Sequence, residues 1–393
     1  MFLNFEYTSS EGSAQFFNDP SVLFSDKKGG LLIEARDFIE KIKPYKPGKP
    51  IEEVIRELNL KGEVIKLASN ENPLGTSPLA IRAMRRALKE SFLYPDDNCF
   101  YLKNVLAEKF KVSSDEIIVG NGSVEILPLI TLAYLNREDS AVVSQGAFIW
   151  FKIAVSIAGA QLIEVPLKNY THDLKAMLGA IQKNTKLVFI ANPNNPTGTM
   201  VTKKEVEEFF DKIPDRVLVI MDEAYREYID DPQYPDSFEI FRKRDNILIL
   251  RTFSKIYGLA GARLGYGIAR KEIITNLMKL RISFNVNRIS QVAGIAALDD
   301  EEFVKRTVKV NNAGKEFLYD AYKKLGLFYI PTYGNFIFVD FGKDSQIVFE
   351  SLQREGIITR TIKEYGFPNA LRITIGTEEQ NARLIKTLKK ILK

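Results

Sequence analysis

The stretch RTFSKIYGLAGARLGYG, residues 251–267, follows the apolar segment 246–250, which has the composition of a buried strand. Lys255 therefore comes just after the end of a strand, inside the fold. Ser254 and Arg263 add a hydroxyl and a guanidinium, and the glycines of this stretch let the backbone pass close to a bulky group. The combination predicts a phosphate-binding site beside a reactive amine. The alternative is a lysine in an ordinary glycine-rich turn.

Segments with the composition of strands recur along the chain, with helical patterns between most of them. They are expected at residues 64–68, 117–119, 140–144, 161–165, 186–191, 216–221, 246–250 and 264–269. Such alternation predicts an α/β fold with a mostly parallel central sheet that is covered by helices. Ligands bind such sheets beyond the carboxyl ends of the strands.

A smaller α/β domain is expected at the C-terminus. Helical patterns at 271–282 and 287–323 are followed by shorter strands, expected at 328–330, 336–341, 357–360 and 371–375. A length of 393 residues also favours two domains over one hydrophobic core. We predict an extension over 1–33, an arm over 34–63 that packs on the small domain or on a partner subunit, a large domain over 64–285 and a small domain over 286–393.

Composition describes an ordinary globular chain, with 45% hydrophobic and 27% charged residues. The net charge of +5 is spread without a basic block, which argues against nucleic-acid binding. One cysteine, Cys99, and one histidine, His172, exclude an internal disulfide and leave little for a metal site. No apolar run is long enough to span a bilayer, and residues 1–33 do not resemble a signal peptide. We expect a cytoplasmic protein with no metal, nucleic-acid or membrane partner.

Two further motifs follow predicted strands. GNGS, residues 120–123, precedes a helix whose first amides would face an anion, although such turns also serve as plain helix caps. NPNNPTG, residues 192–198, has a backbone restricted by prolines, so that the amide of Asn195 can be directed at a phenolic oxygen. The alternative for this second motif is a rigid turn.

Asp222 ends another apolar strand, and Tyr225 follows three residues later. A buried acid at this place can pair with a pyridinium nitrogen and keep it protonated, while the tyrosine donates to the ring oxygen. The alternative is the magnesium-binding acid of a nucleotide hydrolase. The chain has no Gly-x-x-x-x-Gly-Lys-Ser/Thr loop to support that alternative.

Residues 192–198, DEAY at 222–225, and TFSK at 252–255 followed by Arg263 resemble the signature motifs of fold-type-I pyridoxal phosphate aminotransferases. More narrowly, the chain is similar to the histidinol-phosphate aminotransferases. This similarity is carried by residues 43–45, 66–75, 94–96, 120–123, 284–287 and 371–377. The resemblance runs from about residue 40 to the end. It implies a homodimer that uses pyridoxal 5'-phosphate and exchanges an amino group between L-histidinol phosphate and 2-oxoglutarate in histidine biosynthesis.

The resemblance implies a role for each matching residue around the cofactor. Lys255 would form the Schiff base and carry the proton of the 1,3-shift, and Asp222 would contact the pyridine nitrogen. Asn195 and Tyr225 would contact the phenolic oxygen, and Phe148 would stack on the ring. The groups implied around the cofactor phosphate are Gly122, Ser123, Val124, Ser254 and Arg263, with Tyr94 from the other subunit.

For the substrate, the resemblance implies that Arg372 binds the acidic end and that Arg360 and Tyr45 bind the phosphate of histidinol phosphate. Asn195 is also predicted to bind the substrate. Two arginines and a tyrosine suit a dianion better than a single carboxylate. The alternative for Arg360 is a surface salt bridge. The chain departs from the usual family pattern at three positions, which are Val124, Gly146 and Ser283.

Other functions stay open on the sequence alone. An aromatic amino acid aminotransferase and a phosphothreonine decarboxylase are built on a similar fold. A non-catalytic regulator that binds the same cofactor is the alternative from another class. Such regulators commonly carry a DNA-binding module, for which residues 1–33 are too short and too acidic.

Overall fold

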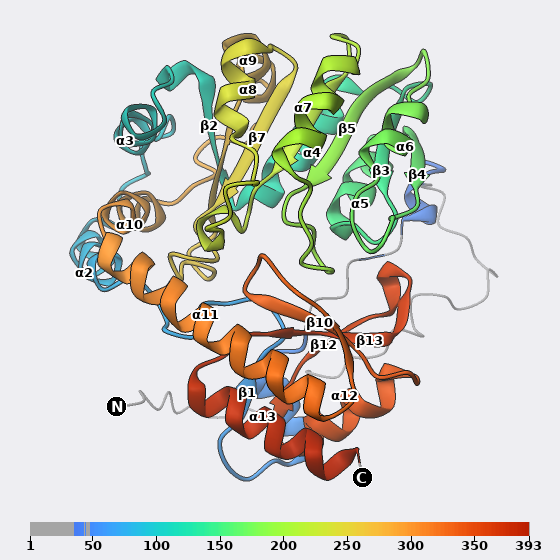
Figure 1. Ribbon diagram of the computed structural model, residues 1–393. Coiled ribbons are helices and arrows are strands. Elements are labelled where there is room, and N and C mark those ends of the chain that lie inside the picture. The colour runs from blue at the N-terminus through green and yellow to red at the C-terminus, as the bar shows by residue number, and fades with distance from the viewer. Residues whose placement is uncertain (1–34, 43, 45–47, 393) are drawn as a thin grey trace, which may run out of the picture.

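The computed structural model describes residues 35–42, 44 and 48–392 (Figure 1). Within them, the larger sheet has seven strands in the order β2-β8-β7-β6-β5-β3-β4. The strands are β2 (Ile117–Asn121), β3 (Ser140–Ser144), β4 (Gln161–Val165), β5 (Thr185–Ala191), β6 (Leu218–Asp222), β7 (Ile247–Thr252) and β8 (Leu264–Ile268). Only β8 runs antiparallel to its neighbours, β2 and β7. The predicted class, α/β with a mostly parallel central sheet, is confirmed.

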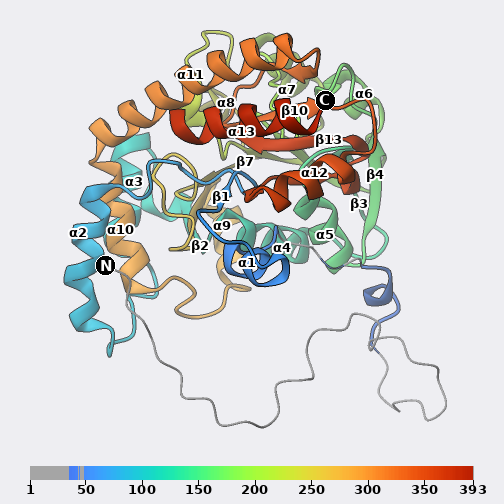
Figure 2. The ribbon, with the colours of Figure 1, turned by 90° about the horizontal axis from the view of Figure 1, so that it is seen from below.

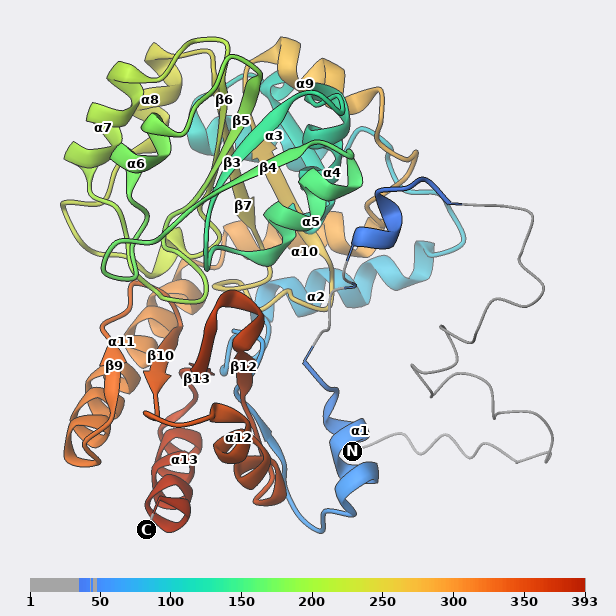
Figure 3. The ribbon, with the colours of Figure 1, turned by 90° about the vertical axis from the view of Figure 1, so that its right-hand side faces the viewer.

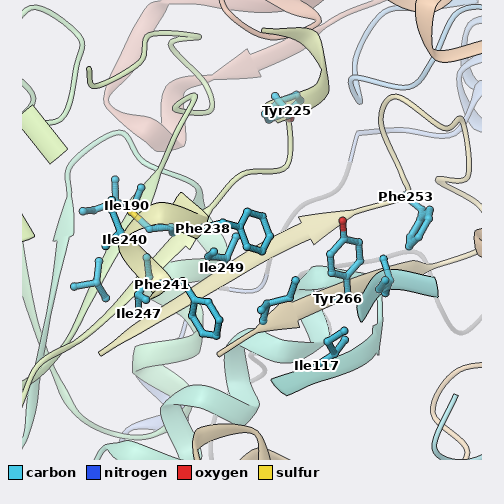
Figure 4. Close-up of a cluster of buried hydrophobic side chains, with 14 of the residues drawn as sticks. Ile117, Ile190, Tyr225, Phe238, Ile240, Phe241, Ile247, Ile249, Phe253 and Tyr266 are labelled. Atoms are coloured by element: carbon cyan, nitrogen blue, oxygen red, sulfur yellow. The ribbon is translucent and has the colours of Figure 1, made fainter. Parts of the chain in front are cut away.

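Helices cover both faces of this sheet (Figures 1 and 3). Successive side chains of a strand point to opposite faces of the sheet, and here both faces are apolar. Val142 and Val188 belong to the buried cluster on one face, and Val143 and Phe189 belong to the cluster on the other. The first cluster includes residues of α3 (Phe100–Phe110), α6 (Leu174–Gly179), α7 (Lys203–Lys212) and α8 (Ser237–Lys243). The second includes residues of α4 (Ser123–Tyr134), α5 (Ile149–Ile157) and α9 (Lys271–Met278). Part of the first cluster is drawn in Figure 4, where Phe238 lies beside Ile249.

A second sheet lies below the first in Figure 1 and is antiparallel, in the order β12-β13-β10-β9. Its strands are β9 (Phe328–Ile330), β10 (Phe336–Asp340), β12 (Arg360–Ile362) and β13 (Phe367–Thr374). Apolar residues of β10 and β13 form a cluster with α11 (Glu301–Lys324), α12 (Ser345–Arg354) and α13 (Glu378–Ile391). Figure 2 shows these helices on the side that faces away from the larger sheet.

The short strand β1 (Ile65–Lys66) pairs in parallel with β11 (Ile357–Ile358), so it lies with the second sheet although the predicted large domain begins at residue 64. Helix α1 (Ile51–Leu58) packs against the same pair, because Val54 shares a buried cluster with Ala68 and Ile358. The domain limits themselves stay a prediction.

Residues 287–323 form two helices and not one continuous helix. Helix α10 (Arg288–Leu298) ends before Asp300, whose carboxylate accepts a hydrogen bond from the backbone N–H of Phe303 and so caps α11. The other carboxylate oxygen accepts from the Ser77 hydroxyl, which caps α2 (Pro78–Ala87).

The short 3-10 helices in the described part of the chain are Ile39–Lys41, Leu88–Glu90, Ser114–Glu116, Arg226–Tyr228 and Lys363–Tyr365. Among the described residues, no helix is long and apolar enough to cross a membrane.

Candidate active site

A cavity of about 360 Å³ lies at the carboxyl ends of β2, β5, β6 and β7. Because these four strands are parallel, the residues that follow them meet at one edge of the sheet. The lining includes every residue predicted for the cofactor except Tyr94. These residues are Gly122, Ser123, Val124, Phe148, Asn195, Asp222, Tyr225, Ser254, Lys255 and Arg263.

Lys255 lies in the turn after β7, and its Nζ donates a hydrogen bond to the carbonyl oxygen of Ser69 at 3.0 Å. The pKa of this amine is lowered to about 7, mainly by burial and also by the positive charges of Arg372 and Arg263, while Glu71 and Asp222 oppose this shift. At slightly alkaline pH the amine is therefore largely uncharged. In that form it is a nucleophile and can also accept a proton.

Asp222 is buried at the end of β6, where its Oδ1 accepts a hydrogen bond from the backbone N–H of Ala224 at 3.1 Å. The pKa of this carboxyl is raised to about 6, mainly by burial and also by the neighbouring Glu223, while the hydrogen bond from Ala224 and the charge of Lys255 oppose the shift. No arginine or lysine of the described chain forms an ion pair with it. A buried carboxylate of this kind fits a ligand that brings its own positive charge, such as a protonated pyridine nitrogen.

The turn before α4 and the start of that helix form the anion-binding part of the cavity. Gly122 has φ +77°, and a Cβ at this position would lie 2.6 Å from an Nη of Arg263, so the backbone and the guanidinium are close neighbours. A Cβ at Gly265 would lie 2.2 Å from the backbone nitrogen of Ser123. Amides at a helix N-terminus together with an arginine favour a phosphate group.

Arg372 joins the two sheets beside the cavity. Its guanidinium donates hydrogen bonds to Asn195 Oδ1 at 2.7 Å and to the carbonyl oxygen of Ala68 at 2.6 Å. Its Nε is buried and has no hydrogen-bond partner among the described residues. In the β12–β13 pairing Arg360 lies directly opposite Arg372, which puts both side chains on one face of the second sheet.

Arg360 does not line the 360 Å³ cavity. Its side chain is largely buried and forms an ion pair with Glu364, four residues later. The alternative of a salt bridge at the surface is thus partly correct, because a salt bridge exists but the arginine is not exposed. Arg360 thus lies opposite Arg372 in the second sheet. Arg372 is connected to the cavity through its hydrogen bond to Asn195, which lines it.

Among the described residues, three predicted site residues do not line the cavity, namely Arg360 and Arg372, which lie beside it, and Tyr94. Tyr94 is 79% exposed and stacks on Phe284, with the ring centroids 4.7 Å apart. Tyr45 lies outside the described residues. Phe148 does reach the cavity, where it precedes α5 and makes an edge contact with Phe151 at 5.7 Å.

Residues 68–71 also belong to the site although no role was predicted for them, because Ser69 and Glu71 line the cavity and Ala68 contacts Arg372. The sequence feature that could have indicated them is a polar turn directly after a short strand, which resembles the other strand ends of the site.

One departure from the family pattern has a structural explanation. A Cβ at Gly146 would lie 2.9 Å from the ring of Phe367, so glycine allows this part of β13 to pack closely. Nothing in the structure explains Ser283.

Comparison with known proteins agrees with this geometry. The sequence profile of the family described as "Aminotransferase class I and II" matches residues 62–388. The chain belongs to the class I and II aminotransferase family. The match spans both sheets and every predicted site residue except Tyr45, and it agrees with the predicted enzyme class and cofactor, pyridoxal 5'-phosphate.

Similar sequences narrow the family further. A protein of Moorella thermoacetica named histidinol-phosphate aminotransferase is 50% identical over 91% of this chain and 93% of its own length. A protein of Pseudomonas fluorescens (strain Pf0-1) named histidinol-phosphate aminotransferase 2 is 46% identical over 93% of this chain and 99% of its own length. The resemblance inferred from the motifs is therefore confirmed.

Solved structures of this family have the same fold. The histidinol-phosphate aminotransferase of Sinorhizobium meliloti, in complex with pyridoxal-5'-phosphate, has a TM-score of 0.84 and 27% identity, over 91% of this chain and 97% of that one. An aspartate aminotransferase of Thermus thermophilus with maleate has a TM-score of 0.80 over 92% of this chain and 100% of that one. At 20% identity it supports the fold alone.

The uncompensated charge of Asp222 leads to a prediction about the cofactor-free protein. Because folding raises the pKa of Asp222 from 3.8 to about 6, its contribution to stability is complete below pH 3.8 and is lost as the pH rises through 6. We expect D222N to be more stable than the wild type by about 3 kcal/mol at pH 8 and by little at pH 4. Urea unfolding of the cofactor-free proteins at both pH values measures this difference.

The matched control is D211N, which changes an exposed aspartate of α7 and should leave the stability unchanged at either pH. Cofactor affinity should change in the opposite direction, because D222N removes the partner of a protonated ring nitrogen. A gain in stability of equal size at pH 4 and pH 8 would show that charge is not its cause.

Proposed function

We propose that this protein is a pyridoxal phosphate-dependent aminotransferase that converts L-histidinol phosphate and 2-oxoglutarate into imidazole acetol phosphate and L-glutamate, a step of histidine biosynthesis. The observation that carries the choice of substrate is the Arg360–Arg372 pairing beside the cavity. Two guanidinium groups on one face of a sheet favour a phosphorylated substrate over a neutral side chain. Relatives at 44–50% identity over about nine-tenths of the chain have names that agree with this proposal.

The cavity residues divide the work of transamination. When bound, the cofactor supplies an electron sink that allows a C–H bond beside the amino group to break. Lys255 attaches the cofactor and, as an uncharged amine, takes the proton from one carbon and returns it to another. Asp222 holds the proton on the ring nitrogen, and Asn195 and Tyr225 donate to the ring oxygen.

Anion binding by this chain holds the two reactants in place. The first amides of α4, Ser254 and Arg263 hold the cofactor phosphate. Arg372 accepts the acidic group of either substrate, since both histidinol phosphate and 2-oxoglutarate are anions. Its contact with Asn195 links the position of the substrate to the position of the cofactor ring. Arg360 adds the second cation that a phosphate dianion requires.

The alternatives receive less support. Neither an aromatic aminotransferase nor a phosphothreonine decarboxylase is favoured by the names of the similar sequences. A non-catalytic regulator is likewise not favoured by these names, all of which are those of aminotransferases. A cytoplasmic location stays a prediction, supported by a single cysteine, Cys99, which is buried and free.

The proposal predicts which amino donor converts the bound cofactor to its amine form. In single-turnover experiments without an acceptor, histidinol phosphate should bleach the visible absorbance of the bound cofactor at least about tenfold faster than phenylalanine, tyrosine or unphosphorylated histidinol. Stopped-flow absorbance gives the rates. An equal rate with an aromatic amino acid would favour that alternative, and release of carbon dioxide from phosphothreonine would favour a decarboxylase.

Arg360 should matter for the phosphate and not for the chemistry. Loss of a charge-assisted contact costs about 1.5–3 kcal/mol, so R360A should lower kcat/KM for histidinol phosphate about 10- to 100-fold. Unphosphorylated histidinol should react with R360A and the wild type at similar rates. The matched control is R354A, which removes an exposed arginine of α12 that also pairs with an acid four residues away. A similar loss for both donors would place Arg360 in a purely structural role.

We also propose that the protein is a homodimer in which Tyr94 completes the cavity of the partner subunit. Exposed apolar side chains gather in two segments that contact each other through the Tyr94–Phe284 stack. They are Leu88, Phe92, Leu93, Tyr94, Phe100, Tyr101, Ile282 and Phe284. A group of this size favours contact with another chain over exposure to water. The position of Tyr94 outside the cavity of its own chain supports the same proposal.

A mixing experiment tests the shared site. K255A lacks the amine and Y94A lacks the tyrosine, so each alone should have little activity. In a mixed dimer, one site would combine an intact Lys255 with an intact Tyr94 of the other subunit. Random exchange should therefore restore about a quarter of the wild-type activity. Two different affinity tags establish that exchange has occurred. Mixed dimers with no restored activity would mean that Tyr94 serves its own subunit or neither.

A further inference from the structure

Residues 68–70 cross from the second sheet to the cavity and contact three site residues in succession. The carbonyl oxygen of Ala68 accepts a hydrogen bond from Arg372, and that of Ser69 accepts one from Lys255. The side chain of Asn70 then donates through Nδ2 to the hydroxyl oxygen of Tyr225 at 2.8 Å. Ala68 and Ser69 make their contacts through backbone carbonyl groups, which every residue has. Asn70 makes its contact through its side chain, so a substitution at this position can change which group donates the hydrogen bond.

Asn70 is held firmly from both ends of its backbone. It is 1% exposed and has φ +55°, a left-handed conformation that asparagine tolerates better than most residues. Its backbone N–H donates to Thr374 Oγ1 at 2.9 Å, and its carbonyl oxygen accepts from Asn335 Nδ2 at 3.0 Å. Both partners belong to the part of the chain that carries the second sheet.

The hydrogen bonds around Asn70 favour one orientation of its side-chain amide. An N–H group can only donate, so the Thr374 oxygen accepts from the Asn70 backbone and the Thr374 hydrogen is available to donate. Asn70 Oδ1 receives that hydrogen, at an O···O distance of 3.2 Å, and Nδ2 faces Tyr225. In the reverse orientation the Thr374 oxygen would accept from both the backbone and the amide, and the Thr374 hydrogen would lose this acceptor.

The same reasoning extends to the tyrosine. An amide nitrogen has hydrogens and no acceptor lone pair, so the Tyr225 oxygen accepts and its own hydrogen is directed away from Asn70. Tyr225 lines the cavity, and its ring is fixed by an edge contact with Phe336 at 5.1 Å. A phenolic hydrogen turns only about the C–O bond. A strong donor at the oxygen therefore restricts where that hydrogen can point.

We propose that Asn70 is a positioning residue that keeps the Tyr225 hydroxyl turned as a donor toward the ring oxygen of the cofactor. This inference rests on the proposed cofactor, though not on the identity of the amino donor. Thr374 sets the orientation of the Asn70 amide, and Asn70 sets that of the phenol. The hydroxyl then stabilises negative charge on the ring oxygen without having to reorient during the reaction.

Replacement of the amide by a carboxylate reverses the decisive hydrogen bond. N70D has nearly the same shape and tolerates the same backbone conformation, but its side-chain oxygens only accept. The Tyr225 hydroxyl then donates to the carboxylate and no longer to the ring oxygen. The pH midpoint at which the visible absorbance of the bound cofactor changes should rise by about one unit, and kcat should fall about tenfold or more.

Comparison with Y225F separates this effect from the added negative charge. If Asn70 acts through the hydroxyl, N70D/Y225F should have a midpoint and a kcat close to those of Y225F alone. A general effect of charge or of distorted packing would persist in the double variant and add to the effect of Y225F. Full additivity, or an unchanged midpoint in folded, cofactor-loaded N70D, would overturn the proposal.

A second pair of variants tests the same proposal without adding a charge to the site. It remains informative even if N70D fails to fold. T374V removes the hydroxyl that orients the amide, and T374S keeps it. We expect T374V to raise the midpoint in the same direction as N70D, and T374S to match the wild type. Equal midpoints for both variants would overturn the proposal. Absorbance of the bound cofactor needs no amino donor, so failure of histidinol phosphate as a substrate would leave this result interpretable.

Discussion

Burial of unlike charges at one edge of a parallel sheet is the constraint on which the whole site depends. Lys255 and Asp222 both have pKa values moved toward neutrality because burial disfavours their charged forms. At the surface, water would solvate the charged forms of both groups, and their pKa values would return to those of an ordinary lysine and an ordinary aspartate. The seven-stranded sheet provides the buried place, and the carboxyl ends of its strands provide the groups that surround it.

A second buried pair allows Asp222 to stay without a basic partner. Glu223, the next residue, is fully buried and accepts two hydrogen bonds from Arg251, at 2.7 and 2.9 Å. Arg251 lies against the rings of Phe110 and Phe238, at 5.4 and 5.5 Å from their centroids. One acid of the Asp-Glu pair is thus neutralised inside the protein. The charge of the other remains for the ring nitrogen of the cofactor.

Local sequence pattern was sufficient for the strands and for most of the cavity. Most strand limits differ by a residue or two from those expected, but the segment expected at 357–360 forms two short strands, β11 and β12, and β13 begins four residues before the expected 371. The polar residues that follow β2, β5, β6 and β7 do meet. What the pattern could not supply was pairing over long distances. β1 joins β11 almost 300 residues later, and Asn70 bonds to Thr374 across 304 positions. The break between α10 and α11 could not be predicted either, because the helical periodicity continues through it. The break is made by Asp300, which caps the start of α11.

The two sheets divide recognition between them, and residues 68–70 are where the two parts meet. The first sheet carries the amine, the buried acid and the phosphate-binding turn, which any cofactor-dependent reaction of this family needs. The second carries Arg360 and Arg372, which we propose to bind the substrate, and Thr374, which lies on the same strand as Arg372. A displacement of the second sheet would therefore alter the Arg372 contact with Ala68 and the Thr374 contact with Asn70 together. Binding of an anion by Arg372 would hold β13 in place, and the same strand then keeps the Tyr225 hydroxyl directed at the reacting ring.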